Sequence, residues 1–282
     1  MARFERGFSC RAFSYAAERI SRDLSCPVDR RDLEDRRRPH SEREAPVRPG
    51  HGRTGAGAVI EVRNLVFGYG RSEFSIEVPS LSVNSGERVA LVGPSGCGKT
   101  SLVYLIAGIL RPERGTITVD GDVITGLGEA ALRTYRITRI GFVFQQFELL
   151  DYLTVRDNIL LPNLVNKALP AARSRRDEAR ALASSLGVGD KLSRRPAQLS
   201  QGEKQRVAIC RALPNQPDIV IADEPTGNLD PEMSHRIMEL IHEQVTARGA
   251  TLLMVTHDHT LLDPFDRVID CRGFAGPAKA AA

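Results

Sequence analysis

Short runs of apolar residues divide most of this chain into candidate strands and helices. Residues 59–62 and 74–78 alternate apolar and polar side chains, which predicts two half-buried strands. Segments of helical character, among them 171–186, fill about residues 146–214. Three other runs are almost entirely apolar, as in the central strands of a parallel sheet: 88–92, 219–222 and 252–256. The pattern therefore predicts an α/β core that is interrupted by a helical insertion.

The first 58 of the 282 residues lack this pattern. They hold 13 Arg and 9 acidic residues, a net charge of +4, and they end in a Pro/Gly-rich stretch. We expect residues 1–58 to form a disordered Arg-rich extension and residues 59–282 to form one domain. The rest of the chain carries 26 basic and 26 acidic residues. Since nucleic-acid-binding domains usually present a basic surface, nucleic acid is not an expected partner.

Composition also bears on the compartment in which the chain works. The five cysteines form no Cys-x-x-Cys pair, which predicts a reducing cytosol with neither a disulfide framework nor a zinc site. The N-terminus lacks the apolar segment of a signal peptide, and the apolar run 102–110 is far shorter than a membrane span. We therefore expect any membrane contact to be made through a partner.

The apolar run 88–92 leads directly into the most informative motif of the chain. Residues 93–100 read Gly-Pro-Ser-Gly-Cys-Gly-Lys-Thr, the G-x-x-x-x-G-K-[ST] pattern of phosphate loops, and a helical segment follows. Glycines let successive backbone N–H groups face one anion, and the helix N-terminus adds partial positive charge. Lys99 can reach the terminal phosphates, and Thr100 can ligate Mg²⁺. The sequence predicts a nucleoside triphosphate site with these contacts: Gly93, Pro94, Ser95, Gly96, Cys97, Gly98, Lys99, Thr100 and Ser101.

Two carboxylates follow the predicted strand at 219–222. In a doubly wound sheet, ligands bind at the carboxyl ends of the parallel strands, where Asp223 and Glu224 are expected to lie. Asp223 is placed to hold Mg²⁺ through water, and Glu224 to accept a proton from the attacking water as a general base. Acidic residues end many strands, so this pair is informative mainly because a phosphate loop precedes it.

A third motif lies at residues 199–207, which read Leu-Ser-Gln-Gly-Glu-Lys-Gln-Arg-Val. They are similar to the L-S-G-G-Q signature and trailing Q-R-V of the ATP-binding cassette (ABC) ATPases, and the resemblance covers about residues 59–274. It implies a P-loop NTPase core of ABC type with an antiparallel β-subdomain and an inserted helical subdomain. It also implies ATP and Mg²⁺ as ligands, and Thr100, Gln145 and Asp223 as the residues around the metal.

The signature implies a contact with a second copy of the chain. In the family, this segment opens a helix and presents Ser and Gly to the γ-phosphate bound by the other subunit. Ser200 and Gly202 stand at these positions, whereas Gln201 replaces the first glycine and Glu203 the final glutamine. A capping box between Ser200 and Glu203 would also explain the pattern locally. We expect phosphate contact in trans to survive, while the extra carboxylate leaves the hydrolysis rate and ATP affinity open.

Two further residues match loops of the family on either side of the signature. Tyr69, in Phe-Gly-Tyr-Gly, matches the aromatic residue that stacks on adenine, although such an aromatic is often a core or edge residue. Asp230, in Asn-Leu-Asp, matches the loop that crosses the dimer interface.

The resemblance also implies two catalytic residues beside Glu224. Gln145 matches the loop glutamine that touches Mg²⁺ or water, and its neighbour Gln146 is a rival for that role. His257 matches the histidine that contacts the γ-phosphate, and His259 is its rival. In both cases the end of the preceding strand favours the first residue of the pair.

By resemblance, the chain is expected to form a homodimer that closes on two ATP molecules and reopens after hydrolysis. It would bind a separate integral-membrane permease through the cleft beside Gln145 and the helical insertion, at the cytoplasmic face of the inner or plasma membrane. Residues 142–150 and 224–230 look like those of lipoprotein-release and macrolide-export ATPases, which implies export or mechanotransmission. Two alternatives stay open: a non-transport ATPase that regulates a cell-envelope enzyme through a membrane adaptor, and an importer ATPase.

Overall fold

The computed structural model of the chain describes residues 57–69, 74–166, 169–227 and 229–276. The predicted extension lies outside the described residues except for its last two positions. Strand β1 (Ala58–Gly68) begins at the very end of that extension, one residue before the predicted strand.

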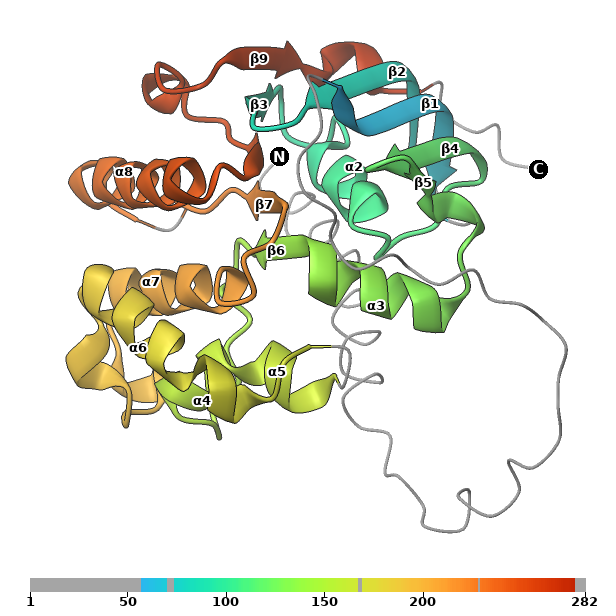
Figure 1. Ribbon diagram of the computed structural model, residues 1–282. Helices are drawn as coiled ribbons and strands as arrows, with labels where there is room; N and C mark the ends of the chain where they lie inside the picture. The colour runs from blue at the N-terminus through green and yellow to red at the C-terminus, as the bar shows by residue number, and fades with distance from the viewer. Residues whose placement is uncertain (1–56, 70–73, 167–168, 228, 277–282) are drawn as a thin grey trace, which may run out of the picture. The chain divides into compact units, whose positions relative to one another are not determined.

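The described residues form two β-sheets (Figure 1). The first is antiparallel, with the strand order β2-β1-β4-β5. Its remaining members are β2 (Ser75–Asn84), β4 (Arg114–Val119) and β5 (Asp122–Val123). The second is wholly parallel, with the order β6-β7-β8-β3-β9. Its members are β3 (Arg88–Val92), β6 (Ile140–Val143), β7 (Ile219–Asp223), β8 (Thr251–Val255) and β9 (Arg267–Asp270).

The central parallel strands are the apolar runs of the sequence. Strand β3 has the predicted bounds, β7 extends one residue further to Asp223, and β8 begins and ends one residue earlier than predicted. Every residue of β7 and β8 is buried, because these strands have neighbours on both sides and helices packed on their faces. The helices that accompany the sheets are α2 (Lys99–Ile106), α3 (Glu129–Arg139) and α8 (Pro231–Arg248).

Helices dominate the segment between β6 and β7. They are α4 (Val155–Ile159), α5 (Leu161–Val165), α6 (Arg176–Ser185) and α7 (Gln201–Ala212). Short 3₁₀ turns intervene: η3 (Ala172–Arg175), η4 (Gly189–Lys191) and η5 (Pro196–Gln198). The predicted helix over 171–186 is thus a 3₁₀ turn followed by α6, since Arg175 leaves helical geometry at φ −100° and ψ 0°. Helix α7 contacts β6 as well as α4 and α6, so this segment and the parallel sheet share one hydrophobic core.

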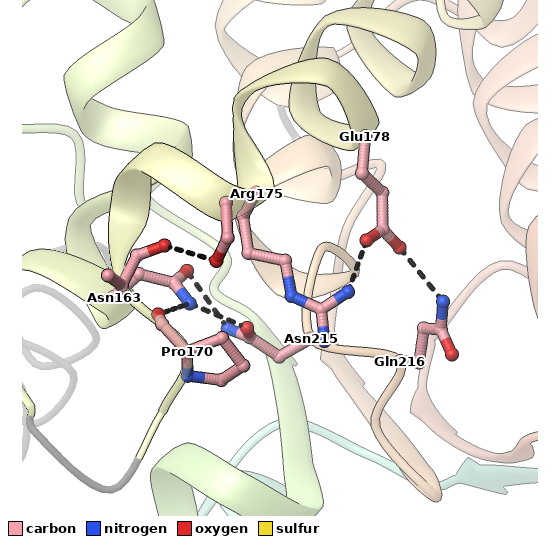
Figure 2. A network of polar contacts seen from close by, with 8 residues as sticks. Asn163, Pro170, Arg175, Glu178, Asn215 and Gln216 are labelled. Carbon is pink, nitrogen blue, oxygen red and sulfur yellow. Dashed lines mark hydrogen bonds and ion pairs between the residues drawn. The ribbon is translucent and has the colours of Figure 1, made fainter.

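A polar network ties three parts of the helical segment to the loop that follows α7 (Figure 2). Asn163 on α5 donates to the carbonyl of Pro170 at 3.0 Å and exchanges side-chain hydrogen bonds of 2.7 and 3.2 Å with Asn215. Glu178 on α6 accepts a hydrogen bond of 3.1 Å from Gln216. Because Asn215 and Gln216 lie in the short loop after α7, which ends at Ala212, these contacts hold the C-terminal end of that helix against α5 and α6.

Candidate functional site

The phosphate loop joins β3 to α2 at the carboxyl end of the parallel sheet. Gly93, Gly96 and Gly98 have φ values of 149°, 82° and 99°, a region that residues with a side chain rarely adopt. Space is tightest at Gly98, where an added Cβ would lie 2.2 Å from Cγ2 of Ile76 on β2. The glycines therefore allow both the path of the loop and its close approach to the antiparallel sheet.

Lys99 is the first residue of α2, and its side chain turns back into the phosphate loop. It is 6% exposed, and Nζ donates to the carbonyls of Gly93 and Pro94 at 2.8 and 3.0 Å. The same Nζ lies 3.9 Å from Sγ of Cys97. One ammonium group thus lies among the loop atoms that an anion would meet.

A hydroxyl and a carboxylate lie together beside the phosphate loop. Oγ1 of Thr100 donates to Oδ1 of Asp223 at 3.1 Å, and Asp223, the last residue of β7, is 1% exposed. Burial raises the pKa of this carboxyl to about 7, and the charge of Glu224 adds to the effect, whereas the Thr100 hydrogen bond and Lys99 oppose it.

These oxygens fit Mg²⁺, which is usually bound by one or two protein oxygens together with substrate phosphates. Across the described ranges, no three His, Cys, Asp or Glu side chains form a metal-binding group. The hydroxyl of Thr100 and the carboxylate of Asp223 suit an ion that is shared with a bound phosphate.

Gln145 and His257 both lie next to Glu224, so the three predicted catalytic residues form one cluster. Its backbone lies in the left-handed region at φ 44°, and its N–H donates to the carbonyl of Val255 at 3.0 Å. Nε2 of Gln145 donates to Oε2 of Glu224 at 3.0 Å, and Nδ1 of His257 lies 3.4 Å from Oε1. The side chain of Glu224 keeps 20% of its surface exposed, so water can reach the carboxylate.

In each rival pair, the structure places the first residue in contact with Glu224. Gln145 and His257, which follow β6 and β8, are the glutamine and the histidine that contact Glu224. Gln146 is exposed, and His259 is an exposed residue that begins a 3₁₀ turn, η6 (His259–Leu261).

Tyr69 connects the end of β1 to the first turn of α2. Its hydroxyl lies 3.0 Å from Oγ of Ser101, and its ring packs against those of Phe67 and Phe74 at centroid distances of 4.8 and 5.7 Å. Burial raises the pKa of the phenol, although the contact with Ser101 opposes the shift. The ring thus lies next to the phosphate loop, as adenine stacking requires, and it also has the neighbours of a packed aromatic residue.

The signature residues cap the helix that they open. Oγ of Ser200 accepts the backbone N–H of Glu203 at 3.2 Å, and Oε2 of Glu203 accepts the N–H of Ser200 at 2.8 Å. The latter bond lowers the pKa of Glu203, and Nζ of Lys191 lies 3.9 Å from its Oε1. Over the described residues, no hydrogen bond joins Ser200, Gln201, Gly202 or Glu203 to the phosphate loop.

Asp230 has a local contact of its own. It is the N-cap of α8, and its carboxylate accepts the backbone N–H of Met233 at 3.0 Å. An added Cβ at Gly202 would lie 3.2 Å from Sδ of Met233, so α8 packs closely on the signature turn. Asn228, which precedes Asp230 in the matched motif, lies outside the described residues.

The sequence motifs did not predict a role for Arg211, a buried cation. Arg211 on α7 is 8% exposed and donates to the carbonyls of Phe147, at 2.6 Å, and Glu148, both in the loop that carries Gln145. Burial lowers its pKa to about 10, which still leaves it protonated at neutral pH. The sequence does contain one sign of this contact, because Arg211 is the single charged residue in the apolar run 207–213. A buried charge is costly unless it has partners, so such a residue is expected to bind polar groups.

The chain resembles known proteins in both sequence and structure. The profile of the family described as "ABC transporter" matches residues 76–227. The lipoprotein-releasing system ATP-binding protein LolD of Pseudomonas syringae pv. tomato is 41% identical over 220 residues, which are 77% of this chain and 96% of that protein. LolD of Maricaulis maris is 44% identical over 190 residues, 67% of this chain and 82% of its own length.

A solved structure has the same fold. It is a dimeric ATP-binding cassette in a post-hydrolysis state with ADP and Pi, 32% identical with a TM-score of 0.67, and the match covers 79% of this chain and 99% of that one. The profile match spans the phosphate loop, Gln145, the signature and the Asp223–Glu224 pair. The chain therefore belongs to the ABC transporter family of ATPases.

Proposed function

We propose that this chain is the ATP-hydrolysing subunit that powers a separate integral-membrane permease of the lipoprotein-release or export type. The observation that carries the proposal is the convergence of Gln145 and His257 on the carboxylate of Glu224. Asp223, the last residue of β7, directly precedes Glu224 and accepts a hydrogen bond from Thr100 in the first turn of α2. The names of the relatives support the transport class, since two are lipoprotein-releasing ATP-binding proteins.

ATP is proposed to bind along the phosphate loop and the first turn of α2. Tyr69 would stack on adenine, and backbone N–H groups of residues 93–101 would surround the phosphates. Lys99 would exchange the carbonyls of Gly93 and Pro94 for phosphate oxygens. Thr100, Gln145 and Asp223 would hold Mg²⁺, which neutralises phosphate charge when it is bound.

Hydrolysis is proposed to depend on Glu224 as the general base. As a water oxygen attacks the γ-phosphorus, its proton passes to the Glu224 carboxylate and ADP leaves. Gln145 donates to Oε2, which fixes the carboxylate and leaves Oε1 on the side of His257. His257, whose side chain is 62% exposed, is free to turn toward the γ-phosphate.

A second copy of the chain is proposed to complete each site. Ser200 and Gln201 are exposed at the N-terminus of α7, where backbone N–H groups and the helix dipole favour an anion. Gly202 and Glu203 would complete this signature contact, and Asp230 would lie at the interface. ATP would then close the dimer by binding to both copies at once.

The proposed face for the permease lies on the helical segment. Tyr152, Leu164 and Val165 are 70%, 55% and 53% exposed, and exposed apolar side chains of this kind mark protein interaction sites. None of the helices in the described ranges is long and apolar enough to cross a bilayer. We place the chain peripherally at the cytoplasmic face of the inner or plasma membrane. Residues 59–282 would form the nucleotide-binding domain, with residues 1–58 as an extension.

Glu224→Gln tests the proposal. Loss of a general base should lower ATP hydrolysis by about 10²- to 10⁴-fold while ATP and Mg²⁺ still drive dimer formation, measured by phosphate release and by light scattering after size exclusion. Glu243→Gln, at an exposed position of α8, is the matched control and should leave both results unchanged. A Glu224→Gln variant that stays monomeric with ATP and Mg²⁺ contradicts the two-copy site.

The same variant tests the partner. Glu224→Gln with ATP is used to capture partners from detergent-solubilised native membranes, and their membrane spans are counted. A partner with few spans and a large extracytoplasmic domain supports the proposed class. A permease with many spans and no such domain would instead indicate an importer.

A further inference from the structure

The loop that carries Gln145 bends through two residues in an unfavourable backbone conformation. Phe147 and Glu148 have φ values of 52° and 49°, and neither is a glycine. Residues with a side chain rarely adopt the left-handed region, and they remain there only when surrounding contacts hold them. Two backbone hydrogen bonds within the loop support the bend: the N–H of Phe147 donates to the carbonyl of Phe144 at 3.3 Å, and that of Glu148 donates to the carbonyl of Gln146. Contacts from outside the loop add to them.

Arg211 on α7 provides these contacts. Its guanidinium donates to the carbonyl of Phe147 at 2.6 Å and to that of Glu148, and Cζ lies 5.9 Å from the centre of the Phe144 ring. The group thus touches the loop on both sides of Gln145. A planar guanidinium can serve two carbonyls at once, whereas a Lys ammonium offers a single charge centre.

A second side chain holds the loop beyond the bend. Asn158 on α4 is 0% exposed, and its Oδ1 accepts the backbone N–H of Leu150 at 2.7 Å. Its Nδ2 donates to the carbonyls of Leu150 and Thr154, each at 3.0 Å. The loop after Gln145 is therefore fastened to α7 by Arg211 and to α4 by Asn158.

Helix α7 connects this attachment with the signature. Arg211 lies in the last turn of α7, and Ser200 is its N-cap. The C-terminal end of the helix is held against α5 and α6 by Asn215 and Gln216 (Figure 2). Helix α7 therefore joins the signature at one end to the carbonyls that Arg211 holds at the other.

We propose that Arg211 is a positioning residue of the ATPase, which makes the placement of Gln145 at Glu224 depend on the orientation of α7. The inference rests on the proposed function, because it assigns Ser200, at the other end of α7, to the ATP of the second copy. Binding at one shared site thereby sets the position of Gln145 in the other site of the dimer. Arg211 links the two sites without touching ATP.

The test compares the full chain with Arg211→Met, Arg211→Lys and Arg136→Met over a range of ATP concentrations. Arg136 is the matched control, because it also donates to the carbonyl of a positive-φ residue, Gly108, at 2.7 Å, but from α3. We expect kcat of Arg211→Met to fall about 10- to 100-fold, as for a misplaced catalytic group. KM should change much less, and the Hill coefficient should fall toward one. Arg211→Lys should be intermediate, and Arg136→Met should keep the wild-type kcat and Hill coefficient.

The chain contains no tryptophan, so Phe147→Trp provides a unique fluorescent reporter in the loop. In the Glu224→Gln background, MgATP should shift the emission of this reporter, and addition of Arg211→Lys should reduce the shift. This second measurement applies even if Arg211→Met does not fold.

Unchanged kcat and Hill coefficient in a folded Arg211→Met, or an unchanged emission shift with Arg211→Lys, would overturn the inference. A wild-type chain that neither hydrolyses ATP nor dimerises would overturn the proposed function instead. The two failures are therefore distinct.

Discussion

The phosphate loop and the loop that carries Gln145 both follow a strand of the parallel sheet, yet they are held in different ways. The phosphate loop takes positive φ values at Gly93, Gly96 and Gly98, where no side chain opposes them. The Gln145 loop takes positive φ values at Phe147 and Glu148, and Arg211 holds their carbonyls from another helix. One loop is shaped by its own sequence, and the other by a tertiary contact.

This difference suits the two proposed tasks. A site that binds phosphate in every step of a cycle benefits from a shape that is built into the local backbone. Gln145 is proposed to respond to a second copy of the chain, and such a response is possible when its position depends on another element, here α7. The contrast predicts that the phosphate loop is broken by changes within it, whereas the Gln145 loop is broken from α7 or α4.

Gly98→Ala should have the largest effect. The added Cβ would lie 2.2 Å from Ile76 at a φ of 99°, so the loop must shift away from its anion-binding shape. We expect ATP affinity to fall at least about 100-fold, or about 2.7 kcal/mol, in calorimetric titration. Gly128→Ala is the control, because φ is −69° there and no atom of the described residues lies within 4 Å of the added Cβ. Wild-type affinity in Gly98→Ala would show that the glycines do not shape the site.

Asn158→Ala should have the next largest effect, on stability. The change leaves the backbone N–H of Leu150 without its acceptor, and the carbonyls of Leu150 and Thr154 without one of their donors. Loss of such partners costs about 1–3 kcal/mol, so we expect about 2 kcal/mol less free energy of unfolding in urea. Asn84→Ala, at an exposed position of β2, should change the stability by much less. Equal values for the two variants would mean that Asn158 does not fasten the loop.

Much of the fold could be predicted from the sequence because its signals are local. The strands β3, β7 and β8 are short apolar runs, and the phosphate loop has a fixed spacing of glycines before a helix. Asp223 was predicted by its place at a strand end, and Thr100 by its place in the motif; the structure brings the two together at 3.1 Å.

The parts that could not be predicted depend on contacts between distant residues. The contact between Arg211 and the Gln145 loop joins positions more than 60 residues apart, and no local pattern specifies it. The capping of α8 by Asp230 is a different case, because it joins positions only three residues apart; the assignment of Asp230 by resemblance to a dimer interface gave no sign of it. The roles of the individual site residues remain predictions for the experiments above.

Replacement of two residues of the Gln145 loop by glycine should have the smallest effect, and it tests most selectively how that loop differs from the phosphate loop. If Arg211 is needed because Phe147 and Glu148 are strained, glycines at these positions should partly remove the need. In the Arg211→Met background, Phe147→Gly with Glu148→Gly should raise kcat about three- to fivefold, or about 0.7–1 kcal/mol. In the wild-type background, the same pair should give no gain.

Asn64→Gly is the matched control for this exchange. Asn64 lies on β1, outside both the Gln145 loop and α7, with a φ of 48°. Its replacement relieves strain of the same kind, smaller in size because Asn tolerates this region. An equal gain from Asn64→Gly would show that the rescue reflects general stability. A gain confined to the Gln145 loop would mean that the arginine substitutes for the glycines that the phosphate loop has and this loop lacks. Gln145 would then owe its position to α7 rather than to its own neighbours in the sequence.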